Sequence, residues 1–319
     1  FPHRMVRIQA ALALANANPE RAFLDYQNLM PVLIETLGLH AGGRDALVID
    51  PEQSVGNVVA GVLREAGYHV ITDTGLLGGL QKVRAERPGL DLMVIASDVS
   101  GPALEFGLEQ FRGEFRFAAT PTLIIAKPAD QSAARALVQG DHRLGIILPT
   151  DTPEQMLTAV ARVTAAIGTE PITPEKGLAL AKEATAALRL LTVSGNALFD
   201  TAQAEDALLA AMSTPDAELK IAVAEVLGWL PSARGQAVMA ALALDAQVDT
   251  EMRVAMFAAL SEAAKRHGNL LETSHVDAVV ELAEKEADVV IRMAASQTLG
   301  ALNVAGNPAS RIIRNQHRG

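Results

Sequence analysis

Cysteine is absent from this chain of 319 residues, which excludes disulfide bonds, thiol nucleophiles and cysteine-ligated zinc. Aromatic residues make up only 3% of the sequence, although half of it is hydrophobic, so Ala, Leu and Val must fill the core. Uncharged apolar runs of about 18 residues are also missing, and the sequence therefore predicts no membrane-spanning helix. The lack of cysteine further favours an intracellular, cytoplasmic protein.

Positive charge is scarce, because 27 Lys and Arg residues face 37 Asp and Glu residues, for a net charge of −10. Nucleic-acid backbones are bound by clustered basic side chains, so we expect no nucleic-acid partner. The basic C-terminal residues Arg311, Arg314 and Arg318 are interpreted as a solvated chain end.

Motifs for catalysis or for a bound cofactor are also missing. The seven His residues include no pair at the i, i+4 spacing that places two metal ligands on one helix face. The glycine-rich stretch 74–79 lacks the Lys and Ser/Thr of a phosphate-binding loop, and we predict that it forms a turn and the start of a helix. The sequence thus predicts no catalytic residues, no metal site and no cofactor.

Five short apolar runs between residues 45 and 149 alternate with segments long enough for helices. Such alternation predicts a doubly wound α/β domain, with a five-stranded parallel sheet covered by helices on both faces. The runs are Ala46–Ile49, Val70–Thr72, Leu92–Ile95, Leu123–Ile125 and Gly145–Ile147. The first intervening helix is predicted over about Glu52–Ala66, because its valines recur at helical spacing and Gly67 follows as a stop signal.

Three segments of this region resemble the receiver domain of bacterial response regulators. Residues 47–52 resemble its opening strand, residues 63–70 the turn into its second strand, and residues 88–95 its third strand. This resemblance implies a site that holds Mg²⁺ with an acidic pair, accepts phosphate on an Asp, and senses that phosphate with Thr/Ser and Lys.

The receiver positions are only partly retained in this chain. The acidic pair corresponds to Asp50 and Glu52, but the phosphate acceptor corresponds to Ala96, the hydroxyl position to Ala126 and the Lys position to Leu148. The chain is therefore expected to be a degenerate receiver that cannot be phosphorylated. Asp98 does not restore the acceptor in this interpretation, because two residues of extended chain displace its carboxylate by roughly 6–7 Å.

Helical segments with a shared pattern lie on both sides of this region. An Asp, a basic residue four positions later and a Leu seven positions after the base recur in 216–228, 249–260 and 288–300, with basic residues spaced 33 and 39 apart (253 − 220 and 292 − 253). Residues 5–15 are interpreted as a fourth copy, followed by a helix over about 27–37. The pattern resembles HEAT repeats, whose helix pairs stack on one another. The leucines expected to fill the seam are Leu14, Leu227, Leu260 and Leu299.

The predicted fold is thus α/β plus all-α, a flavodoxin-like sheet flanked by HEAT-like helical repeats. We expect an N-terminal helix pair over 1–43, a pseudo-receiver over 44–168, and a connecting helix (174–193) with C-terminal repeats over 169–319. Trp229 is interpreted as a core residue. The start at Phe1 is interpreted as the end of a fragment or a processed terminus.

A receiver-like fold that lacks the residues for phosphorylation favours a non-catalytic protein–protein interaction scaffold, in which the receiver surface or the repeats bind a protein partner. Two alternatives remain open. One is a switch that responds to a small ligand at the carboxyl edge of the sheet, where Ala96 and Ala126 would leave a hollow. The other is an enzyme related to chromophore lyases with HEAT-like repeats, which the repeat pattern alone supports.

Overall fold

The computed structural model describes residues 4–42, 44–86, 89–99, 103–114, 116–168 and 172–303. Residue contacts divide the chain into two compact units, each built from two separate stretches. Unit 1 comprises Phe1–Ala11 and Ala41–Leu178, and unit 2 comprises Leu12–His40 and Ala179–Gly319. This grouping differs from the three consecutive segments expected from the sequence, because the N-terminal segment is shared between the units.

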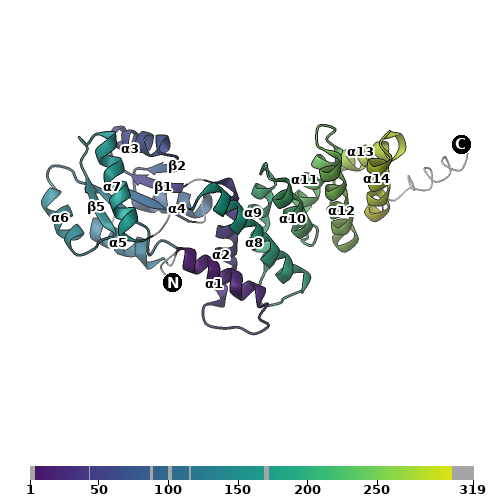
Figure 1. Ribbon diagram of the computed structural model, residues 1–319, viewed down its shortest axis with the longest axis horizontal. Coiled ribbons are helices and arrows are strands. Elements are labelled where there is room, and N and C mark those ends of the chain that lie inside the picture. The colour runs from purple at the N-terminus through teal and green to yellow at the C-terminus, as the bar shows by residue number, and fades with distance from the viewer. Residues whose placement is uncertain are drawn as a thin grey trace, which may run out of the picture. The chain divides into compact units, whose positions relative to one another are not determined.

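Unit 1 contains a five-stranded sheet in which every neighbouring pair is parallel, in the order β2-β1-β3-β4-β5 (Figure 1). The prediction of five parallel strands is confirmed. The strands are β1 (Arg44–Ile49), β2 (Tyr68–Asp73), β3 (Leu92–Ala96), β4 (Thr122–Ile125) and β5 (Leu144–Ile147). The helices between and after them are α3 (Gln53–Glu65), α4 (Leu76–Glu86), α5 (Leu104–Gly113), α6 (Gln131–Gln139) and α7 (Pro153–Ala166).

Each face of the sheet carries its own hydrophobic cluster. On one face, α3 and α7 pack Leu63 and Val160 against strand residues such as Val94. On the other, α4, α5 and α6 cover a cluster that includes Phe111. Because successive strand residues point to opposite faces, strands buried on both sides are apolar throughout, which is why short continuous apolar runs predicted them correctly.

Strand register brings the carboxyl ends of β1, β3 and β4 together. Ile49 pairs with Ile95, and Ala96 pairs with Ile125. The backbone ladder continues beyond these strands, because the Ser97 amide donates to the Ile125 carbonyl at 3.0 Å. Side chains that follow these three strands therefore start from fixed and neighbouring positions.

Unit 2 is helical. Helix α1 (Arg4–Asn16) contributes residues to both units, as does α8 (Pro174–Val193). The remaining α-helices are α2 (Leu29–Gly38), α9 (Glu205–Ala211), α10 (Ala217–Leu227), α11 (Ala233–Leu244), α12 (Thr250–His267), α13 (Thr273–Lys285) and α14 (Val289–Leu302). Short 3₁₀ turns lie at Tyr26–Asn28, Leu39–Ala41 and Thr201–Ala204. Helices α11 to α14 pack as consecutive hairpins, and α12 packs against both α10 and α14 (Figure 1).

Three of these helices begin in the same way, as the repeated sequence pattern predicts. The N-capping residues Asp216, Asp249 and Asp288 each accept hydrogen bonds from backbone amides of the first turn, which satisfies donors that a helix start leaves open. The basic residue four positions later bonds a nearby carbonyl in two copies, since Arg253 donates to Ala243 and Arg292 to Glu286.

The seam leucines divide between the copies. Leu227, Leu260 and Leu299 are buried as predicted, but Leu14 is 41% exposed and does not fill a seam. Helix α1 instead buries Ile8, Ala11, Leu12 and Ala15. Leu14 lies two residues after Leu12 and so faces the far side of the helix. The fourth copy therefore shares the sequence pattern without sharing its buried face.

Trp229 lies just after α10 and is half-buried. The Arg266 guanidinium stacks 3.2 Å from its ring centroid, and the His267 side chain bonds its carbonyl at 2.9 Å. Both partners come from the end of α12, so Trp229 connects neighbouring hairpins. None of the helices in the described part of the chain is long and apolar enough to cross a membrane.

Candidate functional site

Charged and hydroxyl side chains gather at the carboxyl edge of the sheet, at the ends of β1, β3 and β4. Asp50 follows β1, Ser97 follows β3, and Lys127 lies two residues beyond β4. Open parallel sheets commonly bind ligands outside the carboxyl ends of their strands, at the point where the strand order reverses. This is also the edge at which the sequence predicted the remnant of a receiver site.

Lys127 is the centre of the cluster. Its Nζ lies 3.4 Å from Oδ1 and 3.5 Å from Oδ2 of Asp50, and 3.4 Å from Oε2 of Glu52. The Asp50 side chain is fully buried and that of Lys127 is only 13% exposed, whereas Glu52 is 61% exposed. One ammonium group therefore lies within ion-pair distance of both members of the acidic pair and offsets one of their two negative charges.

Ser97 joins the connection after β3 to the one after β4. Its Oγ accepts a hydrogen bond from the Lys127 backbone amide and donates to Oδ2 of Asp130, both at 3.0 Å. On the other side, Oδ1 of Asp50 accepts the Glu52 amide at 2.9 Å. The polar groups thus form one network that links three loops of the sheet edge.

Burial and charge act in opposite directions on this cluster. Burial raises the pKa of Asp50, even though the Glu52 amide and Lys127 both favour its ionised form. Burial alone would lower the pKa of Lys127, but Asp50, Asp98 and Glu52 outweigh it and raise that pKa. Hydrogen bonds from Ser54 and then Lys127 lower the pKa of Glu52. Lys127 therefore stays charged at neutral pH.

The structure places the other predicted positions around this network. Ala96 and Ala126 are fully buried, so their methyl groups complete the two hydrophobic clusters and leave no open hollow. Leu148 packs against the edge of one cluster, and its amide donates to Asp151 at 2.8 Å. Asp98 is exposed, and its charge reaches the network, because it contributes to the raised pKa values of Asp50 and Lys127.

Sequence reasoning missed Lys127 and Ser97. It sought the lysine after the fifth strand, at Leu148, and the hydroxyl after the fourth, at Ala126. The structure brings a lysine from the fourth strand and a hydroxyl from the third. The sequence did contain a signal for them. Ser97 directly follows Ala96 and Lys127 directly follows Ala126, just after two strands that are neighbours in the sheet.

A divalent cation does not fit between these side chains as they lie. Mg²⁺ requires several oxygen ligands in a tight octahedron, and here the Lys127 ammonium group lies against both carboxylates. The described residues also contain no group of three or more His, Asp or Glu side chains arranged to hold a metal.

Two hollows open beside the network. One, of about 290 Å³, has polar side chains between the ends of β1 and β2, including Asp50, Asn57, Asp73 and Lys82. The other, of about 500 Å³, lies between α5 and α6 and is lined by Leu104, Ala133 and Leu137, with Ser97 at its edge. Space for a partner group therefore exists next to the network rather than at Ala96 and Ala126.

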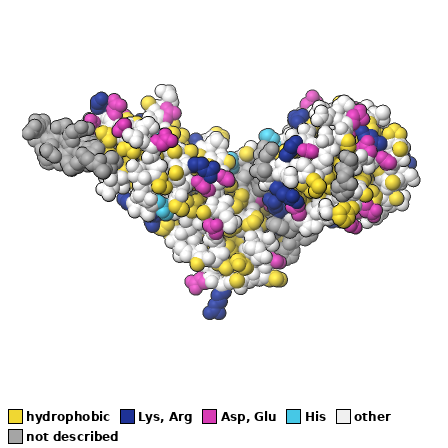
Figure 2. All heavy atoms as spheres, turned by 180° about the vertical axis from the view of Figure 1, so that it is seen from behind, with side chains coloured by type: hydrophobic (Ala, Val, Ile, Leu, Met, Phe, Trp, Pro, Cys, Tyr) yellow, Lys and Arg dark blue, Asp and Glu magenta, His cyan; other side chains and the backbone are white. Residues whose placement is uncertain are grey.

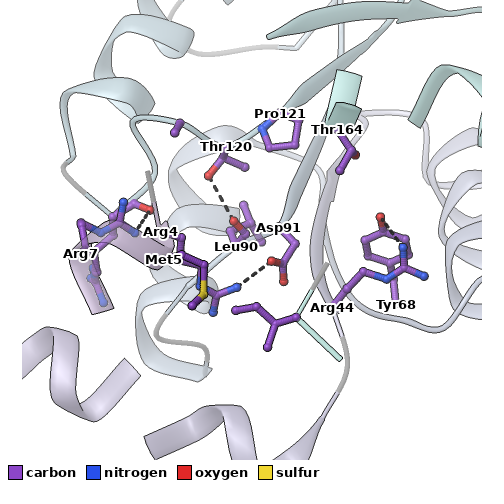
Figure 3. Close-up of a pocket in the computed structure, with 13 residues that line it drawn as sticks. Arg4, Met5, Arg7, Arg44, Tyr68, Leu90, Asp91, Thr120, Pro121 and Thr164 are labelled. Carbon is purple, nitrogen blue, oxygen red and sulfur yellow. Dashed lines mark hydrogen bonds and ion pairs between the residues drawn. The ribbon is translucent and has the colours of Figure 1, made fainter. Parts of the chain in front are cut away.

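The opposite edge of the sheet carries a small cavity of about 50 Å³ with several arginines around it (Figure 3). There Arg4 of α1 pairs with Asp91 at 2.7 Å, and Asp91 also accepts the Asp45 amide. Arg44 stacks 4.3 Å from the Tyr68 ring centroid and donates to the Ala66 carbonyl at the end of α3. These contacts hold α1 and the strand starts together, so this edge has a structural role.

No protein-family model matches the chain, and no curated protein matches it significantly. Among solved structures, the chain is similar to the crystal structure of an uncharacterized protein from Neptuniibacter caesariensis. The identity is 21% and the TM-score 0.32, over 43% of this chain and 89% of that one. A similarity at that level carries no argument about function.

Proposed function

We propose that this protein is a non-catalytic protein–protein interaction scaffold in which a receiver-like domain works without phosphorylation. The observation that carries the proposal is the position of Lys127, whose ammonium group lies 3.4 Å from both Asp50 and Glu52. In a phosphorylated receiver, the charge of the acidic pair is balanced by a divalent cation that helps to bind the phosphoryl group. Here the ammonium group of a protein side chain offsets part of that charge.

The buried methyl groups at the sheet edge support the same proposal. Ala96 occupies the acceptor position and is fully buried, so no carboxylate is available there to accept phosphate. The network through Ser97 and Asp130 already joins the loops that a phosphoryl group would otherwise draw together. The domain would therefore present one constant surface to its partner. The helical hairpins of unit 2, which we interpret as HEAT-like repeats, would add a second surface.

Incubation of the full chain with acetyl phosphate and Mg²⁺ tests this proposal. We expect no mass increase from a phosphoryl group and no change in the thermal midpoint with Mg²⁺ alone. A receiver with its acceptor Asp, treated identically, serves as the positive control. A phosphorylated product with the phosphate mapped to Asp98 would overturn the proposal, because Asp98 would then replace the missing acceptor.

A second candidate function is a switch that responds to a small ligand, and the polar hollow beside Asp50 and Asp73 favours it. The hollow, of about 290 Å³, offers carboxylate, amide, hydroxyl and ammonium groups. A thermal-shift screen with small polar metabolites separates the two functions, because a ligand at 100 times its dissociation constant stabilises a fold by about 2.7 kcal/mol. A hit that is lost in Asn57→Leu would favour the switch over the scaffold.

A further inference from the structure

The strand β2 lies at one edge of the sheet in unit 1. In the order β2-β1-β3-β4-β5 it pairs with β1 on one side, and within the described residues no strand lies on its other side. An edge strand presents its outward backbone groups to strands of other chains, and pairing of that kind leads to association. The opposite edge strand, β5, has four residues whereas β2 has six, so β2 offers the longer edge.

The pairing with β1 fixes which carbonyl groups of β2 point outward. The Asp73 carbonyl accepts the Asp50 amide at 3.1 Å and therefore faces β1. Successive carbonyls along a strand point to opposite sides within the plane of the sheet. The carbonyls of Val70 and Thr72 thus point away from β1, to the side on which another strand could add.

Both outward carbonyls already accept hydrogen bonds from basic side chains. The Lys82 Nζ of α4 donates to the Thr72 carbonyl at 3.0 Å. A guanidinium nitrogen of Arg64, in α3, donates to the Val70 carbonyl at 3.4 Å. Lys82 is also held in place by an ion pair with Asp73 at 2.8 Å. Because α3 and α4 cover opposite faces of the sheet, one cation reaches the edge from each face.

We propose that Arg64 and Lys82 close the β2 edge and so prevent it from pairing with the same edge of a second copy of the chain. A second copy is the partner that must be excluded, because antiparallel pairing of β2 with itself about a two-fold axis needs only this one edge. Such pairing uses the carbonyls that the two side chains occupy. It would also bring the basic side chains of both copies to one seam, where like charges repel. This inference goes beyond the proposed function and does not depend on it.

Removal of both side chains tests the proposal. Arg64→Ala/Lys82→Ala places good helix formers in α3 and α4, so far-UV circular dichroism of the full chain should be unchanged. In sedimentation velocity, we expect this double variant to associate at concentrations about tenfold or more below those of the wild type, because carbonyls are freed in both copies. Lys82→Ala alone should associate more than Arg64→Ala alone, since its contact with the carbonyl is shorter. Should the double variant unfold, the two single variants carry the same test.

Two controls separate closure of the edge from loss of charge. Acidic and basic side chains are interspersed over the face of the molecule drawn in Figure 2, so any loss of basic residues alters a mixed surface. Arg135→Ala/Lys176→Ala removes the same charge from exposed positions of α6 and α8 and should behave like the wild type. Asp73→Asn removes the ion pair of Lys82 but leaves the Thr72 carbonyl bonded, so it should not associate more either.

Hydrogen exchange followed by mass spectrometry identifies the surface that associates. The Val70 and Thr72 amides point outward with their carbonyls, so they should exchange more slowly in the associated double variant than after its dilution. Association without this protection would overturn the proposal. So would a double variant that folds and associates no more than the wild type, or an Arg135→Ala/Lys176→Ala control that associates equally.

Discussion

Single side chains decide the charge balance at the carboxyl edge of the sheet. Lys127 supplies the only cation within bonding distance of the buried Asp50 carboxylate in the described part of the chain. A buried carboxylate without a partner is costly to ionise, so the lysine is what allows Asp50 to stay charged there. The same ammonium group occupies the space beside the carboxylates in which a divalent cation would have to bind.

Replacement of this lysine by methionine should destabilise unit 1 by about 1–3 kcal/mol at neutral pH. Burial already raises the pKa of Asp50, and removal of the positive charge should raise it further. The stability lost in Lys127→Met should therefore be regained as the pH falls through that raised pKa, because a protonated Asp50 needs no counter-charge. Urea denaturation at several pH values measures both effects.

The control for Lys127→Met is Glu52→Gln, which removes the partner that is 61% exposed. Exposed ion pairs contribute little, so this variant should lose much less stability than Lys127→Met. Equal losses for the two variants would contradict the assignment of Asp50 as the buried partner.

A second carboxylate shows the opposite sign of pKa shift. Asp141 accepts hydrogen bonds from Arg143 at 2.8 and 2.7 Å and pairs with Arg112, and these partners hold its pKa far below its ordinary value of 3.8. A depressed pKa adds stability at neutral pH that is lost as the pH falls through the ordinary and then the depressed value.

The expected outcome for Asp141→Asn is a loss of about 1.5–3 kcal/mol near pH 7. The gap between wild type and variant should narrow steadily below about pH 4, since wild-type Asp141 then gives up its advantage. Thermal midpoints recorded from pH 7 to pH 3 provide the measurement. A gap that is independent of pH would show that the amide repacks locally and that charge is not the cause.

At the scale of elements, the sequence predicted the five strands and the helix over residues 174–193, because long apolar periodicity and turn residues act locally. The side chains that meet at the sheet edge depended on which strands are neighbours. No sequence motif marks Lys127. Only the pairing of β3 with β4 places it beside Ser97. The prediction that Leu14 is buried was wrong for a related reason, because a repeated sequence pattern does not determine which face of a helix is buried.

Two glycines offer a test of how tightly the elements of unit 1 pack. A Cβ at Gly145 of β5 would lie 2.6 Å from Val163 of α7 and 2.7 Å from Leu123 of β4. Gly145→Ala should therefore cost about 1–3 kcal/mol through overpacking. A Cβ at Gly61 of α3 would meet nothing within 4 Å, so Gly61→Ala should instead add about 0.5–1 kcal/mol.

Chemical denaturation followed by far-UV circular dichroism measures this pair of variants. The opposite signs make it informative, because a general sensitivity of the domain to substitution would lower both midpoints. Stabilisation by Gly145→Ala would mean that α7 can move away from the sheet at little cost.

At the scale of the whole molecule, each unit is assembled from segments far apart in the sequence. Residues 12–40 belong to unit 2 with residues after 178, and residues 4–11 belong to unit 1. No local sequence signal reveals that the N-terminal segment is divided between the units, because the periodicity of α1 and α2 indicates only that each helix has a face to bury. The packing of α2 on α9 is set by tertiary contacts alone.

The sole tryptophan, Trp229, lies in unit 2 and allows this assembly to be tested. Leu33 of α2 is fully buried, so Leu33→Ala should cost about 2–5 kcal/mol and lower the unfolding midpoint seen by Trp229 fluorescence. Leu63→Ala removes an equally large buried side chain from α3 of unit 1 and serves as the comparison. If the N-terminal segment completes unit 2, the fluorescence midpoint must fall more for Leu33→Ala than for Leu63→Ala. The reverse order would mean that α2 contributes its stability elsewhere.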